Sequence, residues 1–593
     1  MDTSSMLPDD EGILCAERLQ GPYYGLPSLD SVDLGGSDSQ LLVRMDDLCN
    51  KFLSISALVN TRAPVNRLPN EILLQIFLAV QAGTEEGTAP DWPAVLLVCR
   101  RWFAVAATAP HLWRELVVGK SLNLLRTGLV RSKGLTIGVS VIKRDAVPEA
   151  ATTILPHLHR LHSLSISSIH QRHKVHVASL LQHPMPVLER LTAIIESPTT
   201  WVVNTENPSL GIRRMPLRVD KFPKLRSLTA ENIVIPPGPD AVYKQLTVLH
   251  LWGTQIRDYA MFVDILRSCR NVEDLGLELG RGGVDPNMEK VVMPRLRAVQ
   301  LRGWRWFLRD ILQTIVIPAT VDMSIELGGP EHDAVLREQS ISAILPPDYQ
   351  TVLPIFSSVT EVHAQARASE DVLVAYAPSA NSQSERRRLS LRMPIIHRLR
   401  GEGLEPWEAL AGPEGEAQAA EDPREVARSL RQLTIFSAAP VSTLHIDIEA
   451  RQEECVDWGL VLGSLPLLRD VTITAQGHAP DPRGVLGALP WQRLRVVRVR
   501  RFRATPDTYE DDHLFDLIGR TLPFVAVCLV DRAQKGGGKL EELVLDLDCL
   551  DEQQWAEVEV RTRAARKIFA DLVGEFEYRE QQGWRDVFTY KDS

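Results

Sequence analysis

Histidines gather in one short segment of this sequence, where their spacing suggests metal chemistry. Six of the 15 histidines lie within HLHRLHSLSISSIHQRHKVH, residues 157–176. His170, His173 and His176 are spaced three residues apart, and imidazoles at such spacing can share a metal ion. The segment contains no Cys, Asp or Glu to add a ligand or to orient the imidazoles. We therefore interpret these histidines as loop or surface residues and predict no metal site.

Local motifs of enzymatic chemistry are missing from the sequence. It contains no GxSxG nucleophile elbow, no GxxxxGK[ST] phosphate loop, no GxGxxG and no HExxH. Paired carboxylates need no local motif, so an enzyme remains an alternative. The sequence favours a non-catalytic protein without a cofactor.

Composition narrows the class of protein. The 593 residues are 44% hydrophobic, as in a globular protein of several domains, and the net charge of −10 argues against nucleic acid as a partner. The seven cysteines are scattered without a CxxC pair, as expected where thiols stay reduced. The N-terminus is acidic and no run of about 18 apolar residues occurs, so we expect no membrane contact and a cytoplasmic or nuclear location.

The N-terminal part divides into a tail and a helix. Residues 1–38 are rich in Ser, Gly, Asp and Pro and are expected to be disordered. Apolar residues then recur at steps of four and three, which predicts an amphipathic helix over 39–62 that docks on its neighbour. These residues are Leu41, Met45, Leu48, Phe52, Ile55 and Val59.

A second helix is predicted from RLPNEILLQIFLAV, residues 67–80. Pro69 suits the first turn of a helix and biases Leu68 to an extended conformation. A polar connection follows, and then a second helical run that ends in LWREL, residues 112–116. A unit of this size buries its apolar surface incompletely, so part of that surface is expected to meet another protein.

The order of these residues resembles the F-box over residues 65–118. The matching positions are Leu68-Pro69, Glu71-Ile72-Leu73, Ile76-Phe77, Val98-Cys99-Arg100, Trp102 and Leu112-Trp113-Arg114. The connection between the two helical runs departs from the family because it is long and acidic. The resemblance implies docking on a Skp-type adaptor, and through it on a cullin. The implied adaptor-binding residues are Leu68, Pro69, Ile72, Leu73, Ile76, Val98 and Trp102.

A short phrase, apolar-x-x-apolar-x-apolar, returns ten times after residue 120. It begins at residues 161, 188, 246, 272, 296, 359, 441, 468, 494 and 540. Each unit offers one short strand and a return segment that must stack on its neighbours. The region resembles the irregular leucine-rich arrays that follow the F-box in fungal proteins of this layout, although the usual Asn after the strand is missing.

The predicted fold is therefore α/β: a small all-α F-box followed by an irregular leucine-rich-repeat-like solenoid over 120–553. The Glu- and Gly-rich composition near 375–430 predicts a mobile insertion. Residues 554–593, which include Ile568, Phe569, Leu572, Val573 and Phe576, are expected to form a capping helix and a tail.

Alternate residues of the predicted strands line the open face of the sheet. They include His250, His363 and His445 and the predicted target-binding residues Trp252, Glu278, Arg302, Asp447, Arg498 and Arg500. The charged residues either recognise a partner's charges or neutralise one another across strands. The sequence thus predicts the substrate-recognition subunit of a Skp-cullin-F-box (SCF) ubiquitin ligase, which binds an unknown protein target. A leucine-rich scaffold and a non-proteolytic F-box protein are the alternatives.

Overall fold

The protein forms two compact units in the computed structural model. The first is Met1–Thr84 with Pro90–Ala109, and the second is Glu85–Ala89 with Pro110–Ser593. The structure describes residues 38–82, 92–119, 122–196, 217–233, 241–254, 259–279, 290–328, 341–366, 370–378, 386–394, 430, 432–449, 458–476, 483–502, 511–547, 567–579 and 588–591. Nearly all of the predicted N-terminal tail and most of the predicted insertion lie outside these residues.

The first unit is helical. Its elements are α2 (Asp38–Arg62), η2 (Pro64–Arg67), α3 (Asn70–Ala82), η3 (Trp92–Leu97) and α4 (Arg100–Thr108). Pro69 directly precedes α3, and its carbonyl accepts hydrogen bonds from the backbone N–H groups of Ile72 and Leu73. The Leu-Pro pair therefore marks the helix start that the sequence predicts.

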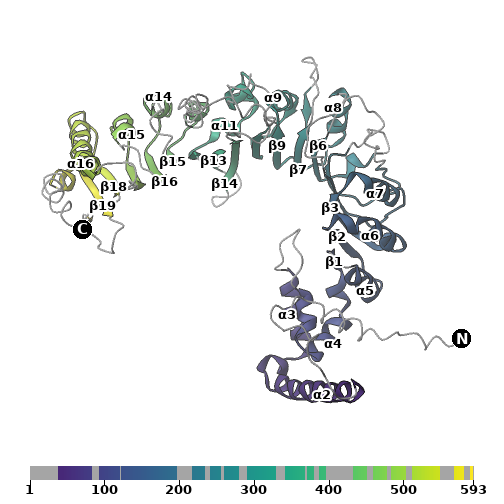
Figure 1. The fold of residues 1–593 in the computed structure, drawn as a ribbon. Coiled ribbons are helices and arrows are strands. Elements are labelled where there is room, and N and C mark those ends of the chain that lie inside the picture. The colour runs from purple at the N-terminus through teal and green to yellow at the C-terminus, as the bar shows by residue number, and fades with distance from the viewer. Residues whose placement is uncertain are drawn as a thin grey trace, which may run out of the picture. The chain divides into compact units, whose positions relative to one another are not determined.

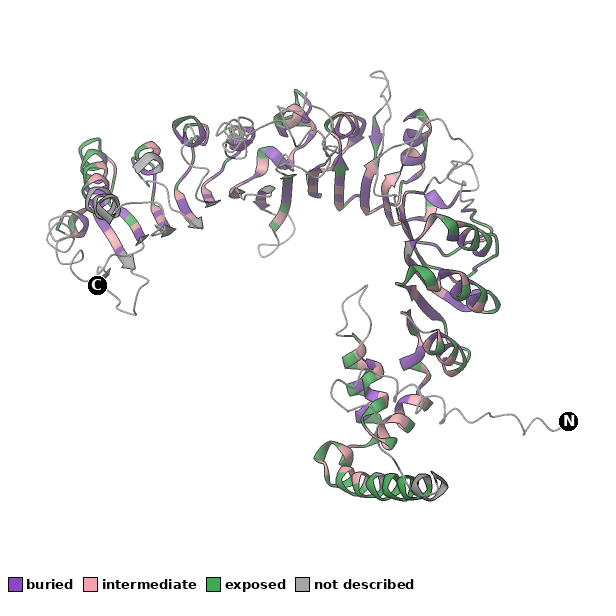
Figure 2. Ribbon diagram, viewed as in Figure 1, coloured by how far each residue is buried: buried purple, intermediate pink, exposed green. Residues whose placement is uncertain are grey.

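The long helix α2 coincides with the amphipathic helix predicted over 39–62. Its apolar seam is nevertheless exposed: Met45, Leu48, Phe52 and Ile55 each keep at least 60% of their surface accessible. Figure 2 shows this helix almost entirely in the colour of exposed residues. The predicted docking of the seam on a neighbouring element is therefore not seen among the described residues.

The second unit is built on one large, mostly parallel sheet (Figure 1). Hydrogen-bonded neighbours run in the order β1-β2-β3-β4-β5-β6-β7-β9-β11-β14-β13-β12-β15-β16-β17-β18-β19-β20. Among the strands that the structure describes, the antiparallel pairs are β14–β13, β13–β12 and β19–β20. A separate parallel pair joins β8 (Val291–Val292) to β10 (Ile315–Val316).

Each of the ten repeated phrases overlaps a strand. The strands are β3 (Leu161–Ile169), β4 (Arg190–Ile195), β6 (Val248–Thr254), β7 (Asp274–Leu279), β9 (Ala298–Gly303), β12 (Glu361–Ala366), β15 (Thr443–Glu449), β16 (Asp470–Gln476), β17 (Val496–Phe502) and β18 (Leu540–Leu547). The strands of the large sheet that lie outside the ten phrases are β1 (Glu115–Val118), β2 (Ile137–Val141), β5 (Ser227–Glu231), β11 (Asp322–Leu327), β13 (Glu370–Pro378), β14 (Arg386–Pro394), β19 (Val573–Arg579) and β20 (Phe588–Lys591).

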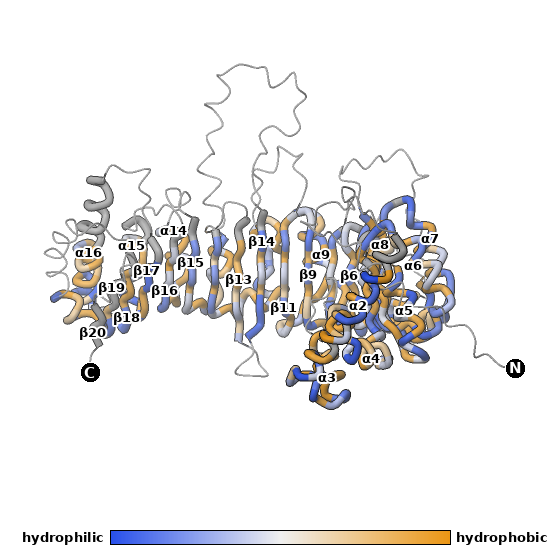
Figure 3. Tube along the Cα trace, turned by 60° about the horizontal axis from the view of Figure 1, so that its bottom comes forward, coloured by the Kyte–Doolittle hydropathy of each residue, from blue (hydrophilic) through white to orange (hydrophobic). Residues whose placement is uncertain are grey.

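Helices return the chain between strands on one side of this sheet (Figure 1). They include α5 (Asn123–Arg131), α6 (Val147–Ile154), α7 (Lys174–Leu180), α8 (Tyr259–Ser268), α9 (Arg305–Thr314), α10 (Tyr349–Val352), α11 (Ile355–Ser358), α14 (Trp458–Gly463), α15 (Arg483–Ala488) and α16 (Asp511–Gln534). Hydrophobic and hydrophilic residues alternate along the strands (Figure 3). One core cluster runs from Leu116 to Phe576 between the strands and these helices.

Two ranges of the second unit differ from the sequence prediction. Strands β13 and β14 fill the sheet between β11 and β12, whereas a mobile insertion was predicted near 375–430. Leu373 and Ala375 on β13 and Leu389 and Leu391 on β14 are buried in the core, as in core strands. Ile568, Phe569 and Leu572 are helical as predicted, whereas Val573 and Phe576 lie in β19, which extends the sheet. None of the described helices has the length and hydropathy that a membrane span requires.

Candidate interaction sites

The start of α3 is held by a hydrogen-bond network that crosses the first unit. The Arg101 guanidinium on α4 donates to the backbone carbonyls of Asn66 and Leu68 and, over 3.0 Å, to Asn70 Oδ1. The indole Nε1 of Trp102 donates to Asn66 Oδ1 over 2.7 Å. Helix α4 thereby fixes the turn that carries the Leu-Pro pair.

An apolar strip remains exposed beside this turn. Ile72, Ile76 and Val80 recur every four residues along one face of α3 and are each about two-fifths exposed. Val98 is 52% exposed, and Pro69 is also exposed, while Leu68 and Trp102 are half-buried. Six of the seven predicted adaptor-binding residues therefore retain accessible surface.

Leu73 does not share this exposure. Both Leu73 and Phe77 are fully buried, and the Phe77 ring lies 5.0 Å from that of Trp102. Along the helix they point about 100° or more away from Ile72. The prediction that Leu73 contacts an adaptor is wrong for this conformation, because Leu73 forms the core that supports the strip.

The end of the motif belongs to the sheet unit. Leu112 and Trp113 lie in the 3-10 helix η4 (Pro110–Trp113) and are buried, and the Arg131 guanidinium of α5 lies 4.9 Å from the Trp113 ring centre. The Arg114 carbonyl accepts a hydrogen bond from the Gly138 N–H of β2. Residues 65–118 therefore contribute to both units, and their last part leads into the first strand.

Trp252 lies at the centre of a charged cluster on the open face of the sheet. The Cα register places Glu231 beside Trp252, Glu278 beside Arg302, and Arg302 beside Glu326. The Arg302 guanidinium lies 4.9 Å from the Trp252 ring centre and 3.0 Å from a Glu326 carboxylate oxygen. Three of the six predicted target-binding residues are thus brought together here, on the face that the sequence register predicted.

Burial shapes the charge of this cluster. Burial raises the pKa of the Glu278 carboxyl, and the neighbouring Glu231 and Glu326 raise it further, while Arg302 opposes them. Burial also raises the pKa of Glu231, again against Arg302. The Arg302 guanidinium therefore acts on the charges of three carboxylates: it pairs with Glu326 and opposes the pKa shifts of Glu231 and Glu278.

The other three predicted target-binding residues lie farther along the sheet. Asp447 on β15 and Arg500 on β17 both flank Thr474 on β16. Arg498 forms an ion pair with Glu542 of β18, and Arg500 is exposed. The Arg302–Glu326 and Arg498–Glu542 pairs are examples of the cross-strand neutralisation considered above.

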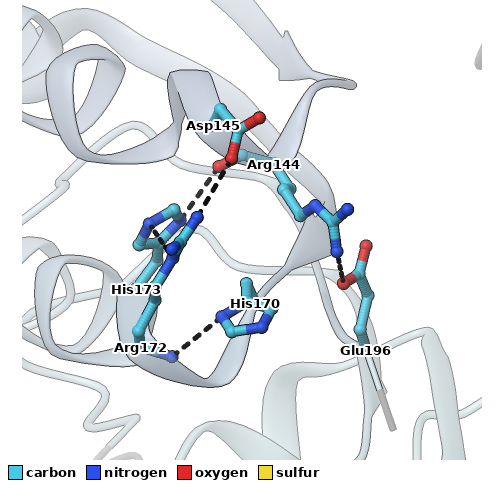
Figure 4. Close-up of polar contacts among 6 residues, drawn as sticks. All are labelled: Arg144, Asp145, His170, Arg172, His173 and Glu196. Carbon is cyan, nitrogen blue, oxygen red and sulfur yellow. Dashed lines mark hydrogen bonds and ion pairs between the residues drawn. The ribbon is translucent and has the colours of Figure 1, made fainter. Parts of the chain in front are cut away.

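The histidine-rich segment is held by hydrogen bonds (Figure 4). Nδ1 of His173 lies 3.0 Å from the Arg144 carbonyl, and its Nε2 accepts a hydrogen bond from Arg172 over 3.1 Å. Arg172 also reaches Asp145, and Arg144 reaches Glu196. The Nδ1 contact of His173 and the Arg172–Asp145 pair tie the turn after β3 to the chain around Arg144.

Sequence reasoning missed several members of these sites. Arg101 donates mainly to backbone carbonyls and Asn66 accepts from Trp102 through its side-chain oxygen, and nothing in the local sequence distinguishes either residue from surface residues. Glu231 was missed because LRSLTA, residues 225–230, was left out of the ten phrases, although it fits their pattern as closely as LERLTA at 188–193 does. Leu225, Leu228 and Ala230 are all buried, so the same pattern could have found this strand.

Comparison with known proteins identifies one domain. Residues 65–118 match the protein family described as F-box-like, so the chain contains an F-box-like domain in this range. This is the range in which the sequence resembles the F-box. No curated protein matches the chain.

Proposed function

We propose that the protein is a non-catalytic substrate-recognition subunit of an SCF-type ubiquitin ligase in the cytoplasm or nucleus. F-box domains generally bind Skp-type adaptors. The observation that carries the proposal is the exposed strip of Ile72, Ile76, Val80 and Val98 on the F-box-like domain. Water contact with such a strip is unfavourable, and covering it on an adaptor contributes roughly 1 kcal/mol for each side chain.

The sheet unit is proposed to hold the target. Its repeated strands and return helices support a leucine-rich-repeat-like solenoid, in which the open face binds other proteins. The cluster around Trp252 is the first candidate contact, because Trp and Arg side chains are frequent hot spots in interfaces. Asp447, Arg498 and Arg500 form a second candidate contact farther along the same face.

The proposed mechanism needs no catalytic residue in this chain. The adaptor would join the protein to a cullin that carries a ubiquitin-conjugating enzyme, while the sheet holds the target nearby. Tethering raises the effective concentration of the target's lysines at the charged enzyme. A non-proteolytic F-box protein would bind the adaptor without changing target lifetime, and a leucine-rich scaffold would not bind the adaptor.

Adaptor binding tests the proposal directly. We expect co-expression with a Skp-type adaptor to give a one-to-one complex in size-exclusion chromatography. Replacing Ile72 and Ile76 together by Asp puts two charges into the contact, and binding is expected to weaken at least about 100-fold. Leu73 is left unchanged because it supports the core.

The matched control replaces exposed apolar residues of the other unit. Val130 on α5 and Val175 on α7 are 77% and 49% exposed, and their double replacement by Asp is expected to leave the complex intact. The proposal would be refuted if the unmodified chain and both double variants bound the adaptor equally well. It would also be refuted if the unmodified chain formed no complex. Circular dichroism checks that each variant is folded.

A further inference from the structure

A second group of polar side chains meets on the open face, away from the cluster around Trp252. Glu361, His363 and His445 each direct one ligand-type atom to a common point, and these three atoms lie within 4.8 Å of one another. His363 Nε2 is 2.7 Å from Glu361 Oε1, and His445 Nε2 is 3.9 Å from the same oxygen. This is the only group of its kind among the described residues.

The sheet itself creates this convergence. Glu361 and His363 are two residues apart on β12, so they share a face, and His445 lies directly opposite His363 on the parallel strand β15. The two imidazole rings are 4.3 Å apart. Because all three residues stand on paired strands, the positions of their Cα atoms are fixed by the backbone ladder.

Neighbouring side chains orient the group further. The Arg386 guanidinium of β14 binds Oε2 of Glu361 and leaves Oε1 turned to the imidazoles. The Tyr376 ring stands edge-on to His363 at 5.2 Å. A charged partner on the far oxygen is the kind of outer contact that holds a metal-binding carboxylate in place.

The distances suit a small divalent ion. With metal–ligand bonds of roughly 2.0–2.2 Å and tetrahedral angles, ligand atoms lie about 3.4 Å apart. The two distances to Glu361 Oε1 lie on either side of this value. A bound ion would replace the proton that His363 donates to Glu361. The three side chains would then need only to rotate in order to coordinate the ion.

Access and charge are compatible with binding. The side chains of His363 and His445 are 36% and 35% exposed, whereas that of Glu361 is 19% exposed. The arginines that act electrostatically on the group are Arg386, on Glu361, and Arg498 and Arg500, on His445. Arg386 is paired with Glu361 itself and Arg498 with Glu542, which reduces their repulsion of an ion.

We propose that Glu361, His363 and His445 form a binding site for a divalent transition-metal ion of the zinc class. Two imidazoles and one carboxylate are a ligand set that Zn²⁺ takes in proteins, with a further coordination position left to water or to a ligand from outside the chain. The site is independent of adaptor binding, because none of its residues belongs to the F-box-like domain.

The test uses the untagged full chain after removal of metals by a chelator. Zn²⁺ is titrated by calorimetry, and Co²⁺ is titrated while its visible absorption is recorded. One equivalent is expected to bind, with X-ray absorption of the zinc form giving two imidazole nitrogens and carboxylate oxygen. His445→Gln and His363→Gln are each expected to lower the affinity at least about tenfold.

The control exploits the other histidines. His170→Gln with His176→Gln alters the histidine-rich segment and is expected to leave binding unchanged. The proposal is overturned if the unmodified chain takes up no stoichiometric ion, if X-ray absorption finds fewer than two imidazoles, or if only the control variant loses binding. X-ray absorption needs no variant, so the test holds even if His445→Gln unfolds the chain.

Discussion

The absence of a Cβ at Gly276 makes room for the Trp252 ring. At Gly276, the residue after Leu275 on β7, a Cβ would come within 2.6 Å of Trp252 Cζ2 and 2.7 Å of His250 Cδ2. The indole therefore lies across Gly276, where it also meets Arg302. The sequence predicted the face on which Trp252 lies, but nothing near position 252 indicates that a glycine on the next strand makes room for the ring.

Gly276→Ala is therefore expected to displace the indole. We expect a loss of stability of about 1–3 kcal/mol and a change in tryptophan fluorescence, because the added methyl group overpacks the contact. Gly328→Ala is the matched control, since a Cβ at Gly328 meets nothing within 4 Å. Urea denaturation measures both variants, and an effect of equal size at both positions would contradict this account.

The protonation of Glu278 gives a prediction about pH. Burial raises its pKa, and Glu231 and Glu326 add to the shift. The folded chain therefore holds the proton more tightly than the unfolded chain, and stability from this group is lost as pH rises through the raised pKa. At about pH 7, Glu278→Gln is expected to be more stable than the unmodified chain. This difference in stability is expected to become smaller as the pH falls toward about 4.

Urea denaturation across this pH range measures the difference. Glu189→Gln, at an exposed carboxylate, serves as the control and is expected to shift the midpoint little. A Glu278→Gln difference that stays constant with pH would rule out titration of this carboxyl as the cause.

At the scale of elements, one arginine joins the last long helix to the strands beside it. Arg532 of α16 is buried and donates to the carbonyls of Trp491, Leu494 and Gly538. Gly537 allows the backbone after the helix to pass close to the Arg532 side chain, because a Cβ at Gly537 would lie 2.6 Å from Arg532 Cγ. The helix was not predicted from the sequence, because its apolar pattern is interrupted by Pro523.

Arg532→Met is expected to lower the free energy of unfolding by roughly 3 kcal/mol, because several buried carbonyls lose their donor. Lys535→Met provides the comparison. Lys535 forms an exposed pair with Asp531 on the same helix, and its replacement is expected to cost less than about 0.5 kcal/mol. Chemical denaturation of both variants gives the values, and equal losses would mean that the carbonyl contacts of Arg532 contribute little.

At the scale of the whole molecule, the two units have separate cores. The cluster of the sheet unit begins at Leu116 and includes none of the buried residues of α3, η3 or α4. A chain that starts at Pro110 is therefore expected to keep the cooperative unfolding of the sheet while losing adaptor binding. Calorimetry and co-expression measure the two properties, and a truncated chain without a cooperative transition would show that the sheet depends on the first unit.

The sequence by itself determined the features that depend on local pattern. The Leu-Pro start of α3 follows from the restricted backbone of proline, and all ten phrases became strands because their alternation requires one buried and one open face. The F-box-like range, 65–118, was also evident from residue order. The register on the open face followed from the same alternation, so Trp252, Glu278 and Arg302 were placed on the correct side.

Only the tertiary structure decided which residues meet. Leu73 was assigned to the adaptor contact by the resemblance to the F-box, and local sequence does not tell whether this side chain packs inward or remains exposed. Strands β13 and β14 were missed because their place between β11 and β12 depends on pairing across long stretches of chain. The convergence of His363 and His445 with Glu361 also depends on such long-range pairing. It requires β12 to pair with β15, and the order of strands in a sheet cannot be read from any local stretch of sequence.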